Sequence, residues 1–151
     1  MVEMIYYVGV FYLLHLFLKM SFSLHKVPFL EWTYTGGNTS GMTALSERFG
    51  LASDNLRQTL PIFLVFSVLS VVLDVDNLLN AQLWLGFRVL YLLGAVINLY
   101  RFKMIRPIIW IPSIVILFMM GSNLVAWIIL GFESISWALI FFRLVVANKF
   151  F

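Results

Sequence analysis

The stretch Ala44–Leu73, ALSERFGLASDNLRQTLPIFLVFSVLSVVL, decides the fold of this chain. Its second half, from Leu60 onward, is nearly all apolar, whereas its first half carries charged and amide side chains. Neither half alone supplies the ~20 helical residues that cross a ~30 Å hydrocarbon core, but the two halves together do. We therefore predict a single transmembrane helix over 44–73, kinked near Pro61.

Three further apolar runs flank this helix, and each is long enough to span a bilayer as a helix. They lie at about 4–24, 81–100 and 107–130. The segments between them hold turn-forming or charged residues: glycines and a proline in 25–43, an acidic turn at 74–77, and a basic connection at 101–106. The sequence thus predicts an all-α fold, an integral membrane four-helix bundle over 1–130.

The remaining segment, 131–151, is an apolar tail with its own helical pattern. Glu133, Ser136 and Arg143 recur on one helical face of an otherwise apolar run, 132–146. This pattern predicts a short fifth helix that is either interfacial or spanning. Its length favours the interface, because fifteen residues are few for a crossing.

The composition supports a membrane protein and argues against other classes. Apolar residues make up 62% of the 151 residues and charged residues 11%, and the mean hydropathy is +0.98. A water-soluble domain needs more polar surface than this. The basic residues are scattered at helix ends rather than gathered in a stripe, so we expect no nucleic-acid partner. Cysteine is absent and the two histidines lack partners at ligand spacing, so we predict no metal site.

The distribution of Lys and Arg predicts the orientation in the membrane. The first and third connections are basic. In the N-terminal segment and the second connection, by contrast, the only charged side chains are acidic. By the positive-inside rule, the N-terminus lies outside or in the lumen, and the basic connections face the cytoplasm. This holds equally for a bacterial inner membrane and for the endoplasmic reticulum. The basic side chains concerned are Lys19, Lys26, Arg48, Arg57, Arg101, Lys103 and Arg106.

Polar side chains of the second and third spans are predicted to meet near the cytoplasmic boundary. The two spans are antiparallel neighbours, and counting from their short turn puts Asn55 about level with Asn98 to Arg101. Gln58 lies one turn deeper, on the helical face that also carries Arg48. We therefore expect Asn55, Gln58, Asn98 and Arg101 to form a cation-bearing pocket suited to an anionic, peptide-like ligand. The simpler reading is that the arginines anchor the interface and the amides hold helices together.

Arg88 is predicted to lie apart from this pocket. It is about eight residues, or ~12 Å, inside the third span, which is too deep for direct contact with Asn55 or Gln58. A charge at this depth faces the interior of a bundle. We predict a structural role, with a bond to Ser67, Ser70 or a neighbouring chain, while a catalytic role stays open.

Three segments resemble the MAPEG family, the membrane-associated proteins in eicosanoid and glutathione metabolism. The second span has Glu47-Arg48 followed by Ala52, Asn55, Gln58, Pro61 and Phe63, similar to the family's pattern of Glu-Arg, Ala, Asn, Glu, Pro and Phe. Arg88-Val89-Leu90-Tyr91-Leu92-Leu93-Gly94 resembles the family's Arg-x-x-Tyr-x-x-Gly, and 106–110 resembles the start of its fourth helix. The resemblance covers about residues 1–130.

The resemblance implies a homotrimer that binds glutathione between subunits on the cytosolic side. It implies a transferase or peroxidase that acts on lipophilic electrophiles supplied by membrane lipid. Arg101 is then the catalytic residue, because a neighbouring arginine lowers the pKa of a thiol. The glutathione-binding residues that the resemblance implies are Arg48, Asn55 and Tyr91, and the predicted pocket adds Gln58 and Asn98.

Two departures from the family pattern favour an alternative function. Leu51 stands where glutathione-using members carry an arginine, and Gln58 replaces a glutamate. They favour a non-catalytic membrane protein on the same scaffold that binds lipid or a partner. A channel or transporter subunit is a weaker alternative, because only Arg88 supports it.

Overall fold

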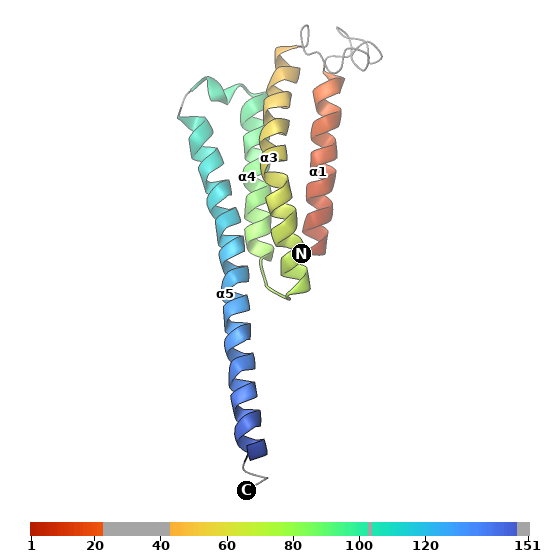
Figure 1. Ribbon diagram of the computed structural model, residues 1–151. Helices are drawn as coiled ribbons and strands as arrows, with labels where there is room; N and C mark the ends of the chain where they lie inside the picture. The colour runs from red at the N-terminus through yellow and green to blue at the C-terminus, as the bar shows by residue number, and fades with distance from the viewer. Residues whose placement is uncertain (23–42, 103, 148–151) are drawn as a thin grey trace.

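The computed structural model describes residues 1–22, 43–102 and 104–147, and its regular elements are all helical. Four of the helices in this part of the chain are long and apolar enough to cross a membrane, which confirms the prediction of an all-α fold with four helices of transmembrane length. They stand side by side, with the shortest connection between α3 and α4 (Figure 1). The elements are α1 (Val2–Ser21), α3 (Ala44–Val72), α4 (Leu78–Val96), the 3₁₀ turn η1 (Leu99–Arg101) and α5 (Ile105–Ala147).

The start of α3 is fixed by its capping residue and by a bond to α1. Thr43 has extended backbone, and its hydroxyl accepts the Ser46 N–H at 3.2 Å. This bond satisfies one of the donors that a helix N-terminus leaves unpaired. The Ser46 hydroxyl in turn donates to the Lys19 carbonyl at 2.9 Å. The predicted second helix is confirmed, and its polar N-terminal half is tied to the end of α1.

The opposite end of the bundle is held by Asn77, which is 1% exposed. Its amide nitrogen donates to the Ser70 hydroxyl at 3.0 Å and to the Met120 carbonyl at 3.2 Å. Its amide oxygen accepts from Asn80 at 3.1 Å and from Asn123 at 2.9 Å. One side chain at the α3–α4 turn thus bonds to α3, α4 and α5.

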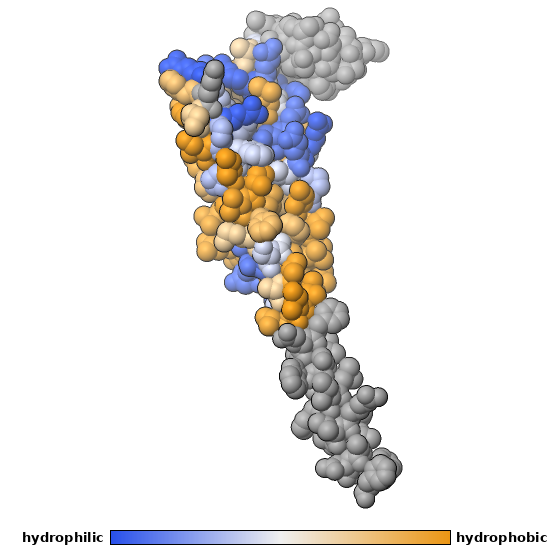
Figure 2. All heavy atoms as spheres, turned by 60° about the vertical axis from the view of Figure 1, so that its left-hand side comes forward, coloured by the Kyte–Doolittle hydropathy of each residue, from blue (hydrophilic) through white to orange (hydrophobic). Residues whose placement is uncertain are grey.

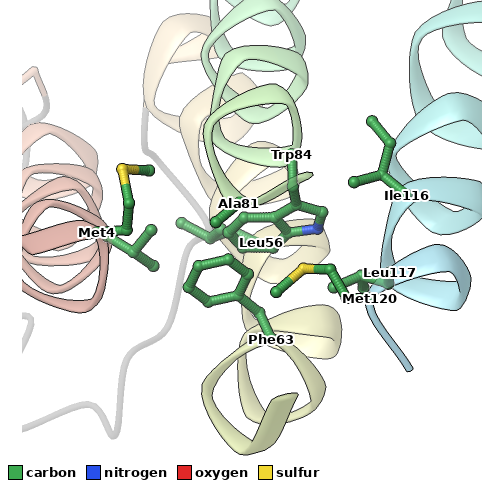
Figure 3. Close-up of a cluster of buried hydrophobic side chains, with 9 residues drawn as sticks. Met4, Leu56, Phe63, Ala81, Trp84, Ile116, Leu117 and Met120 are labelled. Atoms are coloured by element: carbon green, nitrogen blue, oxygen red, sulfur yellow. The ribbon is translucent and has the colours of Figure 1, made fainter. Parts of the chain in front are cut away.

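The apolar core lies between these two polar ends. Phe63 of α3 stacks on Trp84 of α4, with ring centroids 4.2 Å apart. Met4 of α1 approaches this pair from one side and Met120 of α5 from the other (Figure 3). Flat aromatic rings backed by flexible methionines fill such a space closely.

Two predicted boundaries differ from the structure. The third span ends at Val96 rather than near residue 100, because Asn98 adopts the left-handed conformation (φ 59°) and stops the helix. The predicted short fifth helix is not a separate element. Instead, α5 continues without a break from Ile105 to Ala147 and extends past the other helices (Figure 1). Gly131 is the only turn-forming residue at the expected junction, and a lone glycine weakens a helix without ending it.

The N-terminus and the described connections lie at the two ends of the bundle, as an up-and-down arrangement of helices requires. Met1 and the turn around Asp76 line one hollow, so they share an end of the bundle. The start of α3 and η1 lie at the other end (Figure 1). Which end faces the cytoplasm stays a prediction from the Lys/Arg distribution.

Single cysteines test this orientation, because the native chain has none. Glu47 and Asp76 are both exposed, at opposite ends of the bundle. We expect a membrane-impermeant maleimide to label Asp76→Cys from outside intact cells or sealed vesicles. Glu47→Cys should react only after the membrane is permeabilised. Labelling of both variants from outside would contradict the four-span topology, and the reversed pattern would contradict the orientation.

Candidate functional site

Tyr91 on α4 is the centre of a bonded cluster at the end of the bundle near η1. Its hydroxyl accepts the Nε–H of Arg106 at 2.9 Å, and its backbone carbonyl accepts the Tyr100 hydroxyl at 2.6 Å. The tyrosine ring of η1 reaches this carbonyl because Gly94 has no side chain: a Cβ there would lie 2.8 Å from the Tyr100 hydroxyl oxygen. Burial raises the pKa of Tyr100, so its phenol stays protonated and keeps donating.

This cluster forms one wall of a hollow of about 300 Å³, which we call the basic hollow. Three arginines line it and, among the described residues around it, none is acidic. Guanidinium groups recognise carboxylates by charge and by paired hydrogen bonds, so the hollow favours an anion. The lining residues are Arg48, Leu51, Ala52, Tyr91, Ala95, Asn98, Tyr100, Arg101 and Arg106.

The three arginines of the basic hollow differ in how firmly they are held. Arg48 donates to the Val96 carbonyl at the end of α4 and to the Ala44 carbonyl, each at 3.1 Å. A cation at a helix C-terminus is favoured by the helix dipole. Arg101 is exposed, and its guanidinium lies 4.8 Å from the ring centroid of its neighbour Phe102. It is therefore the arginine with most freedom to turn toward a ligand.

A second polar hollow of about 440 Å³ lies between α3 and α5, and we call it the α3–α5 hollow. Its donors come from amide, guanidinium and indole groups, and none of its described lining residues is acidic. Arg106 lines both hollows. The residues around the α3–α5 hollow are Asn55, Gln58, Arg106, Pro107, Trp110 and Ile111.

The predicted site residues therefore fall into two groups. Arg48, Tyr91, Asn98 and Arg101 come together in the basic hollow, whereas Asn55 and Gln58 line the α3–α5 hollow. Asn55 shares a helical face with Arg48 but lies seven residues, or about 10 Å, farther along α3. The predicted single pocket is divided in two, because Asn55 and Gln58 lie beside α5 whereas Asn98 and Arg101 lie at the end of α4 and in η1.

The predicted separation of Arg88 from Asn55 is wrong. A guanidinium nitrogen of Arg88 (Nη1) donates directly to the Asn55 side-chain oxygen, and the group lies over the Trp84 ring at 5.2 Å. The prediction compared the heights of backbone positions, and the long arginine side chain spans the difference. Ser67 and Ser70 were the expected partners, but no bond from Arg88 to either is found in the described part of the chain.

The contact with Arg88 fixes the orientation of the Asn55 amide. Because its oxygen accepts from the cation, its NH₂ group is the part left to bond elsewhere. Asn55 is buried at the base of the α3–α5 hollow. The amide thus offers that hollow a donor rather than an acceptor.

Arg106 is a candidate site residue that the sequence-based prediction missed. It was interpreted as a topology determinant and as the start of the fourth helix, yet it bonds to Tyr91 and lines both hollows. A usable signal was present: Tyr91 and Arg106 are equally distant in sequence from the bend at Asn98–Leu99. Residues so placed face one another across antiparallel helices.

Comparisons with models of protein families, with curated proteins and with solved structures find no match to this chain. The MAPEG resemblance therefore stays a prediction from short motifs.

Proposed function

We propose that this protein is a MAPEG-like membrane enzyme that binds glutathione in the basic hollow and uses its sulfur on lipophilic electrophiles. The observation that carries the proposal is the Tyr91–Arg106 pair, which shares with Arg101 a hollow that no described acidic side chain lines. Glutathione carries two carboxylates and a thiol that must ionise to react. Both features call for nearby cations.

The lining residues fit such a ligand. The volume of about 300 Å³ lies at the small end of the ~300–1,000 Å³ typical of ligand pockets. Arg101 and Arg106 can hold carboxylates, and the Asn98 amide can bond to the peptide groups. Arg48 is committed to backbone carbonyls, which makes it a positioning residue for the end of α4.

Tyr91 is well placed to assist the thiolate. Its oxygen already accepts from Arg106, so its own O–H remains to be donated to the ligand. The adjacent guanidinium makes that O–H a stronger donor. In this proposal, Tyr91 donates a hydrogen bond to the glutathione sulfur. Arg101 stabilises the negative charge of the thiolate and lowers the pKa of the thiol from the usual ~8.5.

The reaction is then a simple displacement. The thiolate attacks an electrophilic carbon, a sulfur–carbon bond forms, the bond to the leaving group breaks, and the proton from the thiol ends on the leaving group. With a lipid hydroperoxide, two thiols are instead oxidised to a disulfide while the hydroperoxide is reduced to an alcohol and water. A homotrimer belongs to the same proposal, with neighbouring subunits completing the open side of the hollow.

Ligand binding without chemistry is the second candidate function. Leu51 lines the basic hollow at the position where the resembled family carries a further arginine, so one cation fewer faces the ligand. A protein of this kind binds lipid or a partner on the same scaffold. It would leave an aryl halide electrophile unconjugated in the presence of glutathione.

Glutathione titration of the purified, detergent-solubilised protein tests the proposal. We expect binding to the native protein and roughly tenfold weaker binding to Arg101→Leu, from the loss of one charge-assisted hydrogen bond. Arg57→Leu is the matched control, because Arg57 is an exposed residue paired with Asp54 at 3.3 Å on α3 and lines neither hollow. Absence of native binding, or equal loss in both variants, would contradict the site.

Tyr91→Phe separates binding from chemistry. It removes the O–H that we assign to the sulfur and also the acceptor of the Arg106 Nε–H, while the ring stays in place and Arg106 keeps its charge. We expect glutathione affinity to change little and the conjugation rate with an aryl halide to fall roughly tenfold or more. A rate equal to that of the native enzyme would remove Tyr91 from the mechanism.

A further inference from the structure

An apolar groove of about 770 Å³ runs between α3 and α5, away from the basic hollow. The groove exists because α5 packs mainly against α4 and more lightly against α3. Its lining is almost wholly hydrocarbon. The residues are Thr59, Ile62 and Phe66 from α3, and Ile114, Leu117, Phe118, Gly121, Ser122, Val125, Ala126 and Ile129 from α5.

This groove continues the α3–α5 hollow. Gln58 of the hollow precedes Thr59 of the groove, and Ile111 of the hollow lies one helical turn before Ile114. The two are neighbours along both helices, polar at the end near η1 and apolar along the rest, and we call them together the crevice. Hydrophilic residues gather at that end of the α5 side, with hydrophobic residues over the middle of the bundle (Figure 2).

We propose that this crevice binds an anionic phospholipid of the surrounding bilayer, with its phosphate in the α3–α5 hollow and one acyl chain along the groove. The polar end offers donors from Arg106, Gln58, Trp110 and the Asn55 amide that Arg88 orients. No described lining residue there offers a carboxylate. An anionic headgroup complements these groups, because it is opposite in charge to Arg106 and its oxygens accept hydrogen bonds from the donors.

The dimensions of the crevice suit a lipid of one leaflet. From Ile114 to Ile129 the groove follows fifteen residues of α5, about 22 Å at 1.5 Å per residue. One leaflet contributes roughly 15 Å of the ~30 Å hydrocarbon core. An acyl chain whose headgroup is level with Trp110 can therefore lie along the part of the groove nearer η1, and Trp110 is a residue type that favours the interface.

The occupant we infer is a lipid rather than a helix from a second copy. Ser122 and Ala126 have the spacing of small residues at helix–helix contacts, and Gly121 lies beside them. In this chain, however, Gly121 accommodates Phe66 of α3: a Cβ at Gly121 would lie 3.0 Å from the Phe66 ring. Gly121 is thus already used within the chain, whereas Ser122 and Ala126 are exposed and line the groove. The occupant is decided by the cationic hollow at the end of the groove, which suits an anionic headgroup.

Native mass spectrometry of the reconstituted protein tests this proposal independently of glutathione. The protein is placed in vesicles of equal parts phosphatidylcholine and phosphatidylglycerol, extracted, and weighed with its retained lipids. We expect phosphatidylglycerol to be enriched roughly fivefold, the preference that one basic side chain gives near anionic lipid. Gln58→Glu puts a carboxylate at the headgroup position and should abolish the enrichment. Arg57→Gln changes the net charge equally, outside the crevice, and should preserve it.

Gly121→Leu tests the apolar part of the crevice. The larger side chain displaces Phe66 or fills the groove, so fewer phospholipids of either kind should be retained. Equal retention of both phospholipids by the native protein would overturn the proposal, as would loss of enrichment in Arg57→Gln or full enrichment in Gln58→Glu. A lipid-free oligomer that Gly121→Leu dissociates would instead make the groove an interface between copies.

Discussion

Replacing Asn77 by alanine is expected to lower the free energy of unfolding by roughly 2–3 kcal/mol, at ~0.6 kcal/mol for each bond of its side chain. The Asn77 amide makes four such bonds, two as donor and two as acceptor. They join the α3–α4 turn to α3, α4 and α5. Because the Asn77 side chain is buried, bulk water cannot reach its former partners and form new hydrogen bonds with them once it is removed.

Titration of the detergent-solubilised protein with sodium dodecyl sulfate, followed by circular dichroism, measures this loss. Asn80→Ala is the matched control, because it removes one bond from the same cluster and takes away a side chain that is only half-buried. Its expected cost is ~0.6 kcal/mol. Equal costs for the two variants would show that Asn77 does not act as the shared centre of the cluster.

The helices were predictable because lipid imposes a simple requirement on sequence. Each span needs a long apolar run, and the predicted 44–73 helix differs from α3 by one residue. The end of α4 was not predictable from apolar character, since Ile97 and Leu99 continue the run. Asn98 stops the helix through its backbone conformation, which hydropathy does not report.

The candidate site was predictable only to the level of one end of the bundle. Counting along the antiparallel spans identified Asn98 and Arg101, which lie around one hollow together with Tyr91, a residue indicated by the family resemblance. It did not place Asn55 in a different hollow, because that depends on how closely α5 approaches α3. The packing of α5 is set by contacts such as Phe66 on Gly121, and a pattern within one helix carries no record of its neighbour.

The pair formed by Arg88 and Asn55 gives the second large expected effect. Arg88 is 3% exposed and bonds to Asn55 through one nitrogen, while Nε and Nη2 have no hydrogen-bond partner in the part of the chain that the structure describes. Most of the charge is therefore compensated only by the face of Trp84. Removing Asn55 takes away the one polar contact that this cation has there.

We therefore expect Asn55→Leu to cost roughly 2–3 kcal/mol, the worth of a hydrogen bond to a buried charged group. Arg88→Met is expected to be as stable as the native protein or more so. It removes a cation whose insertion costs ~2.5–3.5 kcal/mol and keeps an unbranched side chain against Trp84. The double variant should then recover most of the stability lost in Asn55→Leu, because no cation is left unpaired.

Detergent titrations of the three variants decide the matter. If Arg88→Met is the less stable single variant, the arginine contributes stability through contacts beyond Asn55. Our inference that Arg88 lowers the stability of the fold while it orients the Asn55 amide would then be wrong.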